Sequence, residues 1–267
     1  MPESRLVSMV PKRANAQEQE ASTSRGKMKL EIVVHCLNYP RLLCFYLNGL
    51  IVNPPPPWVK VTLFTADDDA VTREVVEYFV CSLDRQQFDF QDISRPREQV
   101  GRRTILRNEA AKATMADWVL FNDVDYLFGP KFWEYLPVAL AAVPQDCPLA
   151  FPRRIMASRT NEEGNKLIHG PWEPPCAVEL PPADHWAPQK FRYAVGGVQF
   201  ARGNYCRKNG YCDGQRKHLR PSREWIRTRE DRAFRAIAGT SGHGIEVQEL
   251  FRLRHSLHSG LGGQFDN

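Results

Sequence analysis

The chain has 267 residues, of which 42% are hydrophobic and 25% charged, and its formal net charge is +5. This length and composition are those of a globular protein with a sizeable core, which can be a single large domain. A net charge this small does not indicate nucleic acid, so we do not expect that partner. The longest apolar run, residues 42–52, is interrupted by Asn48 and Gly49, so we expect no membrane span.

The N-terminus and the cysteines suggest a compartment. The first residues carry Glu3 and Arg5 and no apolar stretch, which excludes a secretory signal there. Seven cysteines form no Cys-x-x-Cys pair, which fits reduced thiols, so we expect a cytoplasmic protein. A zinc site from Cys206, Cys212 and His218 remains an alternative, although its spacing matches no usual pattern.

Strands and helices alternate along the first half of the chain. Residues 1–27 lack periodicity and are predicted to be a disordered lead. After them, β-forming runs alternate with amphipathic ones, and a helix is expected to begin at Pro40. The predicted strands are 30–36, 59–65 and 88–93, and the predicted helices are 40–50, 72–83 and 101–115. This order favours an α/β fold with a mostly parallel central sheet flanked by helices.

The most informative stretch is residues 117–128. Its apolar run 118–121 is typical of a strand buried on both faces, and Asn122, Asp123 and Asp125 follow immediately. Ligands of open α/β sheets bind at the carboxyl ends of the strands. Two carboxylates there can bind a hard divalent cation, which in turn can hold a diphosphate. A polar turn that merely ends a strand is the alternative.

The second half contains further clusters. A predicted strand, 194–202, carries the pair Gly196 and Gly197, which allows close approach of a ligand or another backbone. We also predict a helix at 132–142, strands at 149–155 and 247–253, and a long irregular loop at 157–189. Asp231 and Glu230 begin a short amphipathic helix, where acids also suit the helix dipole.

Cationic and metal-ligating side chains flank these segments. Arg102, Arg103 and Arg107 on the helix 101–115 suit phosphate oxygens, although arginines on such a helix are usually solvated. After the last predicted strand, His255 or His258 suits a manganese-like ion together with Asp125.

Taken in order, these motifs resemble an inverting glycosyltransferase of the GT-A type. The pattern is closest to the β-1,4-galactosyltransferase and chondroitin-synthase group, with the family-2 transferases behind it. The resemblance covers roughly residues 30–259 and rests on 122–125, 196–200, 209–211, 230–231 and 254–256. It implies one GT-A (Rossmann-like) domain over 28–262, with a nucleotide-sugar-binding half, 28–128, and an acceptor or catalytic half, 129–262.

The resemblance also implies a role for individual residues. Asp231 would be the catalytic base and Glu230 would bind acceptor or sugar hydroxyls. Asp125 and His255 would ligate Mn²⁺ or Mg²⁺, with Asp123 at the metal or the nucleotide sugar. The donor, with a UDP-sugar preferred over a GDP-sugar, would contact the following residues: Cys36, Asn38, Asp67, Arg103, Arg107, Asn108, Asp123, Gly196 and Gly197. The acceptor would be a glycan or another hydroxyl compound.

Two departures and two rival functions complete the prediction. The galactosyltransferases have Trp-Gly-Gly before the Glu-Asp pair, where this chain has 225–229, and a methionine metal ligand where this chain has Arg252. One rival is a phosphatase of the haloacid-dehalogenase type, with an aspartate of 123–125 as nucleophile. The other is a catalytically inactive GT-A-like protein whose basic segment 202–235 binds an acidic glycan or nucleic acid.

Overall fold

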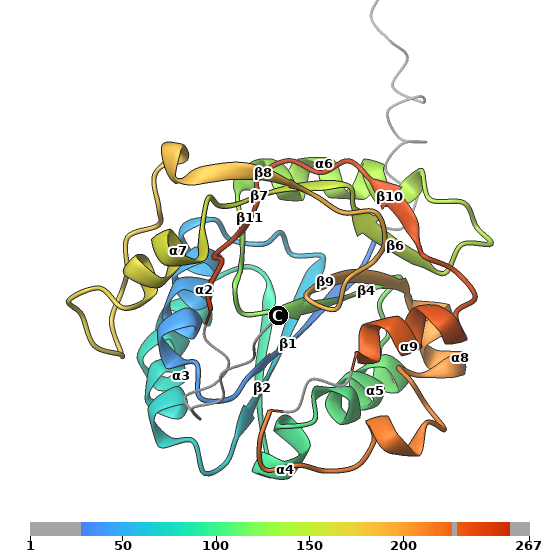
Figure 1. The fold of residues 1–267 in the computed structure, drawn as a ribbon, viewed down its shortest axis with the longest axis horizontal. Helices are drawn as coiled ribbons and strands as arrows, with labels where there is room; N and C mark the ends of the chain where they lie inside the picture. Colours follow the sequence, from blue (N-terminus) through green and yellow to red (C-terminus); the bar gives the residue numbers. More distant parts are fainter. Residues whose placement is uncertain (1–27, 226–228, 257–267) are drawn as a thin grey trace, which may run out of the picture.

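The computed structural model describes residues 28–225 and 229–256. The predicted lead 1–27, the last residues of the predicted domain and His258 lie outside the described residues. Two β-sheets with helices packed around them make up the described part (Figure 1). Within it, no helix is both long and apolar enough to cross a membrane.

The larger sheet has seven strands and is mostly parallel, as predicted. In spatial order they are β10 (His243–Ile245), β6 (Leu149–Pro152), β9 (Val198–Arg202), β4 (Trp118–Asp123), β1 (Leu30–Cys36), β2 (Val59–Ala66) and β3 (Asp89–Arg95). Strands β4, β1, β2 and β3 are parallel to one another, and β9 runs antiparallel to both β4 and β6. The carboxyl ends of β1 and β4 therefore meet the start of β9 at one edge.

Helices cover both faces of this sheet, because alternate residues of its central strands point to opposite sides. One group of helices comprises α2 (Pro40–Val52) and α3 (Ala70–Leu83), and the other comprises α4 (Arg97–Val100), α5 (Arg103–Ala113), α8 (Gly203–Asn209) and α9 (Glu230–Ile237). Figure 1 shows the two groups on opposite sides of the sheet. Leu30, Ile32 and Val34 pack with the first group, whereas Val119 and Phe121 pack with the second.

A smaller, four-stranded sheet lies above the larger one in Figure 1. Its strands are β5 (Tyr126–Phe128), β11 (Leu250–Arg252), β7 (Arg154–Ser158) and β8 (Trp186–Lys190). The remaining helices are α6 (Pro130–Ala141), α7 (Asn161–Ile168), η1 (Ala183–His185) and η2 (Arg216–His218). In the antiparallel pair β5–β11, Arg252 lies opposite Tyr126, which places residues 252–255 beside the turn after β4.

The structure corrects three sequence-based predictions in the second half. The single strand predicted at 149–155 is wrong: the chain passes from β6 into β7 at Arg153, whose amide donates to the carbonyl of Ile245 on β10. Pro152 cannot donate to a ladder, which suits a change of sheet at this point. The loop 157–189 contains α7 and β8, and the strand predicted at 247–253 is limited to β11.

Candidate functional site

The site is built where β4 ends. Asp123 is the last residue of that strand, opposite His35 of β1, and its amide donates to the carbonyl of Gly197 at 3.0 Å. The buried Asn122 side chain donates to the same carbonyl at 2.9 Å. A Cβ built on Gly197 would lie 2.9 Å from the ring of Tyr126, so this glycine leaves room for that side chain. The predicted approach of a ligand or another backbone to the glycine pair remains a prediction.

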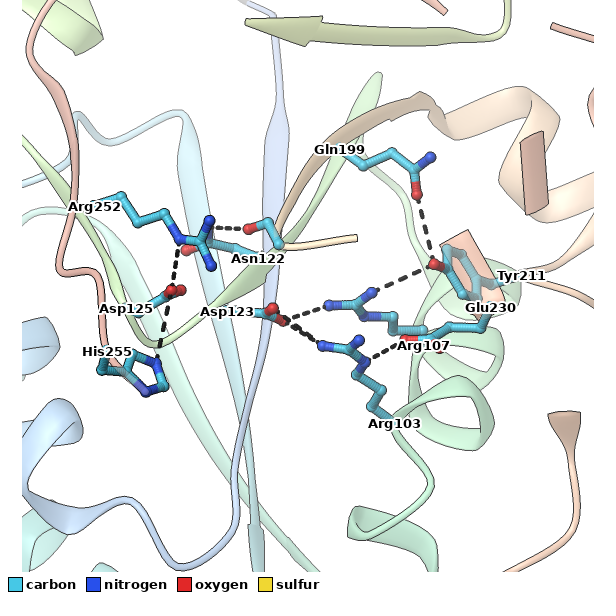
Figure 2. Close-up of polar contacts among 11 residues, drawn as sticks. Arg103, Arg107, Asn122, Asp123, Asp125, Gln199, Tyr211, Glu230, Arg252 and His255 are labelled. Atoms are coloured by element: carbon cyan, nitrogen blue, oxygen red, sulfur yellow. Dashed lines mark hydrogen bonds and ion pairs between the residues drawn. The ribbon is translucent and has the colours of Figure 1, made fainter. Parts of the chain in front are cut away.

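Two arginines of α5 hold the Asp123 carboxylate. Arg103 donates from Nη1 to both oxygens, at 2.9 and 3.0 Å, and Arg107 donates from Nη2 to Oδ1 at 2.9 Å. Arg107 is completely buried, and its Nη1 also reaches the hydroxyl of Tyr211 at 3.3 Å. Figure 2 shows both guanidinium groups directed at Asp123. They are therefore part of the site and not the solvated face of a helix.

The same arginines join α9 to the site. Arg103 donates from Nε to Glu230, which is 1% exposed in the first turn of α9. Burial alone disfavours the charged guanidinium, but the carboxylates of Asp123 and Glu230 outweigh it and raise the pKa of Arg103 above its usual value. Arg103 is thus a permanent cation bridging two acidic residues from distant parts of the chain.

Asp231 follows Glu230 and lies beside the glycine pair. Its Oδ2 accepts from Arg235 Nη1 at 3.1 Å. A Cβ on Gly196 would lie 3.1 Å from the Cβ of Asp231 and 3.7 Å from Nη1 of Arg107. The predicted base, the glycine pair and the arginines of α5 are therefore contiguous.

Asp125 lies on the other side of the β4 end, where it faces β11. Arg252 donates from Nε to Asp125 Oδ2 at 2.8 Å, and His255 Nε2 lies 3.9 Å from the same oxygen (Figure 2). The charges of Tyr126 and Asp125 raise the pKa of Arg252 above its usual value. Asp125 is 4% exposed, and its Oδ1 has no hydrogen-bond partner among the described residues.

A cavity of about 240 Å³ opens between these groups at the carboxyl edge of the sheet. It combines acidic, basic and aromatic side chains, which suits a ligand with both a charged and an aromatic part. It is lined by His35, Tyr39, Leu42, Arg103, Asp123, Val124, Asp125, Trp225, Arg252 and His255.

The structure brings together most of the residues predicted for the site. These are Arg103, Arg107, Asp123, Asp125, Gly196, Gly197, Glu230, Asp231 and His255. Four others do not line the cavity: Cys36, Asn38, Asp67 and Asn108. Cys36 is fully buried, Asp67 is exposed, and Asn108 faces the turn after α8. Asn38 has φ of 59°, and its amide donates to Asp69 at 2.7 Å. The donor contacts assigned to these four remain predictions.

Sequence reasoning missed part of the cavity. His35 is buried, and neither of its ring nitrogens has a hydrogen-bond partner among the described residues. Burial, together with Arg107 and Arg103, lowers its pKa well below the usual value. The sequence did not indicate His35 as a site residue, because it lies within a predicted apolar strand. Trp225 places its ring 4.7 Å from the guanidinium of Arg103. Arg252 was noted only as a departure from a family pattern.

The side chains at the end of β4 supply only some of the ligands that a divalent metal needs. Among the described residues, no three or more His, Cys, Asp or Glu side chains form a metal-binding group. The alternative zinc site from Cys206, Cys212 and His218 is therefore not present among them. Asp125 and His255 still form an adjacent pair with an unpartnered carboxylate oxygen. Mg²⁺ is commonly bound by one or two carboxylates plus substrate phosphates. The pair fits an ion whose remaining ligands come from a diphosphate.

Comparison with known proteins supports the fold. No protein-family model matches the sequence, and no curated protein matches it. Solved structures do: the mannosyltransferase PcManGT from Pyrobaculum calidifontis, in complex with GDP-Man and Mn²⁺, has a TM-score of 0.52 at 10% identity. S. aureus TarS 1-349 in complex with UDP-GlcNAc has a TM-score of 0.52 at 12% identity.

These likenesses define the architecture. They cover 91% and 89% of this chain but only 64% and 62% of the two solved chains, so this chain spans less than two thirds of their length. The fold is that of GT-A glycosyltransferases, as predicted. The particular resemblance to the galactosyltransferase and chondroitin-synthase group remains a prediction.

The contacts of Asn108 lead to a first prediction. Its Oδ1 accepts from the Tyr211 amide at 2.9 Å, next to Gly210, which has φ of +64°. We expect Asn108→Ala to lower the free energy of unfolding by about 1–3 kcal/mol, because a partly buried amide loses its acceptor. Urea unfolding measures this loss. Nucleotide affinity, measured below the unfolding temperature, tests the predicted donor contact separately. A loss of affinity greater than twofold would support that contact, and an unchanged affinity would leave Asn108 with the structural role alone.

Proposed function

We propose that this chain is a glycosyltransferase that moves a sugar, with inversion, from a nucleotide-diphosphate sugar to an acceptor hydroxyl. The observation that carries the proposal is the pair Asp123 and Asp125 at the end of β4, which line one cavity together with their partners Arg103 and Arg252. The buried Arg107 holds Asp123 from behind that lining. The fold shared with PcManGT and TarS supports it. Residues 28–128 are proposed to bind mainly the donor, and 129–262 to supply acceptor contacts and catalytic groups.

The cationic side chains account for the departure of the diphosphate. Breaking the bond between sugar and phosphate places negative charge on the leaving group, and fixed positive charge stabilises that state most. Arg103 and Arg252 line the cavity, and both are held by carboxylates, so they need no reorganisation when the charge develops. The aromatic side chains of Tyr39 and Trp225 are proposed to border the nucleoside.

A divalent ion is part of the proposal. Asp125 and His255 would hold Mn²⁺ or Mg²⁺, with Asp123, two positions before Asp125, at the metal or the nucleotide sugar. Such an ion supplies charge neutralisation at the diphosphate. The Mn²⁺ in the PcManGT complex supports this assignment.

Asp231 is proposed as the base. A single displacement with inversion needs one group to take the proton of the attacking hydroxyl and no covalent nucleophile. The ion pair with Arg235 fixes the Asp231 carboxylate beside Gly196, next to the arginines of α5. Glu230 is bonded to Arg103, which makes it a positioning residue; its contact with a sugar hydroxyl is a further part of the proposal.

Two other functions were considered. In a phosphatase of the haloacid-dehalogenase type an aspartate at this strand end would attack phosphorus, but both oxygens of Asp123 accept hydrogen bonds from arginines. A catalytically inactive binding protein needs no ordered base, whereas Asp231 is held in place by Arg235. The donor is proposed to be a UDP-sugar, such as the UDP-GlcNAc in the TarS complex, with a GDP-sugar, such as the GDP-Man in the PcManGT complex, as the alternative.

The base assignment yields the second prediction. Asp231→Asn should lower kcat by at least about 100-fold, because the amide cannot accept the proton, while leaving nucleotide affinity within twofold. Transfer assays and nucleotide titration measure the two quantities. Asp213→Asn, which removes an exposed carboxylate paired with Lys112, is the matched control and should retain full turnover. Normal turnover in Asp231→Asn would remove this residue from the role of base.

The metal assignment yields the third prediction. A chelator should abolish transfer, and Mn²⁺ or Mg²⁺ should restore it.

Arg252→Met should tighten Mn²⁺ binding in the presence of nucleotide diphosphate by at least about tenfold, because it removes a positive charge bonded to Asp125. Titration calorimetry measures the binding, and Arg254→Met is the control with the same charge change. Full activity in chelator, together with unaltered Mn²⁺ binding by Arg252→Met, would contradict the metal assignment. The arginines would then stabilise the leaving group without a divalent ion.

A further inference from the structure

A second groove, of about 720 Å³, lies apart from the donor cavity and shares no lining residue with it. It is formed where β6 passes into β7 and where β8 ends, with β10 at its side. Its charged residues are the four cations Arg153, Arg154, Lys190 and Arg192 and one carboxylate, Glu246.

The positive charge of this groove is not neutralised. Among the described residues, none of the four cations lies within 4.0 Å of a carboxylate oxygen of an acidic side chain. By contrast, Arg103, Arg235 and Arg252 of the catalytic region are all paired. An excess of unpaired positive charge in a concave surface favours an anionic ligand.

Two of the cations are placed against each other. Arg154 and Lys190 are direct partners in the antiparallel pair β7–β8, and both are exposed. Side chains at directly opposite positions project to the same face, and like charges there destabilise a sheet. The fold thus carries an electrostatic cost that an anion bound between the two side chains would remove.

Backbone contacts make the groove a fixed structure. The amide of Phe191 donates to the carbonyl of Arg153 at 2.9 Å, and the amide of Arg153 donates to Ile245 at 2.9 Å. The Arg153 side chain crosses β10, where its Nε donates to the carbonyl of Gly244 at 3.1 Å. A Cβ on Gly244 would lie 2.6 Å from the Arg153 side chain, so this crossing depends on glycine. The three segments therefore hold the groove open without a ligand.

Residues 192–197 connect the groove to the proposed base along the chain. Tyr193 is half exposed, and its ring lies 4.5 Å from the guanidinium of Arg235, the partner of Asp231. Arg235 also donates to the carbonyl of Ala194. From Arg192 to Gly196 the backbone spans at most roughly 14 Å. A short oligosaccharide covers that distance, and Tyr193 offers it an exposed aromatic face on the way.

We propose that this groove binds the acceptor, and that the acceptor is an anionic glycan whose carboxylate, sulfate or phosphate groups pair with Arg154, Lys190 and Arg192. The acceptor's terminal hydroxyl then reaches Asp231 while its preceding units follow residues 192–197. The assignment to an acceptor rests on the proposed glycosyltransferase function. The binding of an anionic glycan does not require turnover and is measured separately.

The test uses the triple variant Arg154→Gln, Lys190→Gln, Arg192→Gln. Its control is Arg85→Gln, Arg216→Gln, Lys217→Gln, which removes the same charge from exposed positions outside the groove. Fluorescence anisotropy at low salt measures binding of a labelled polyuronate oligosaccharide, a sulfated oligosaccharide, a neutral oligosaccharide of equal length and single-stranded DNA. The charged glycan arms identify the anionic group that the groove prefers.

We expect at least one anionic glycan to bind the unaltered chain and the neutral one not to bind. The groove variant should weaken that binding at least tenfold and the control less than twofold. The thermal unfolding temperature of the groove variant should not fall below that of the unaltered chain, since a repulsive pair is removed. Equal losses in both variants, binding of the neutral glycan, or tighter binding of DNA would overturn the proposal. If an anionic glycan binds as expected but no donor is consumed, the proposed glycosyltransferase function is wrong, whereas the binding of an anionic glycan by the groove is confirmed.

Discussion

The carboxylate of Asp123 is the point on which the site depends. Its bonds to Arg103 and Arg107 tie the end of β4 to α5, and the bond of Arg103 to Glu230 adds α9. Arg107 and Glu230 are buried, and removing one partner of a buried ion pair leaves the other charge uncompensated at a cost of about 3–5 kcal/mol. The end of β4 and α5 are thereby fixed to α9, which lies more than 100 residues further along the chain, and Asp231 is positioned as a consequence.

The internal charge balance of this region gives the site a definite chemistry. Four carboxylates are matched by four guanidinium groups: Asp123, Asp125, Glu230 and Asp231 by Arg103, Arg107, Arg235 and Arg252. A nucleotide diphosphate entering the cavity brings negative charge that this balanced set does not neutralise. An additional cation at Asp125 and His255 would restore the balance, which is a physical reason for proposing a divalent ion beside the arginines.

Local sequence pattern was sufficient for β1, β2 and β4 and for the acidic strand end. These strands are short runs rich in β-forming residues, Asp123 ends β4 and Asp125 follows it, so neighbours along the chain contain the signal. The transition from β6 to β7 was not predictable in this way, because it depends on the bond between Arg153 and β10. Likewise, Arg252 enters the site only because β11 pairs with β5 across the second sheet.

The two concave sites of the molecule differ in whether their cationic side chains are paired with carboxylates, and this difference suits them to different proposed ligands. In the donor cavity every arginine is held by a carboxylate, so the ligand meets an ordered but balanced environment. In the groove beside β8, Arg154 and Lys190 face each other, and no carboxylate oxygen of the described acidic side chains lies within 4.0 Å of either. Like charges at directly opposite positions destabilise a sheet. Since Tyr193 and Ala194 connect that groove to Arg235 and thus to Asp231, an anion bound there lies on the acceptor side of the proposed base. Charge distribution, more than shape, therefore distinguishes the site proposed for the donor from the groove proposed for the acceptor.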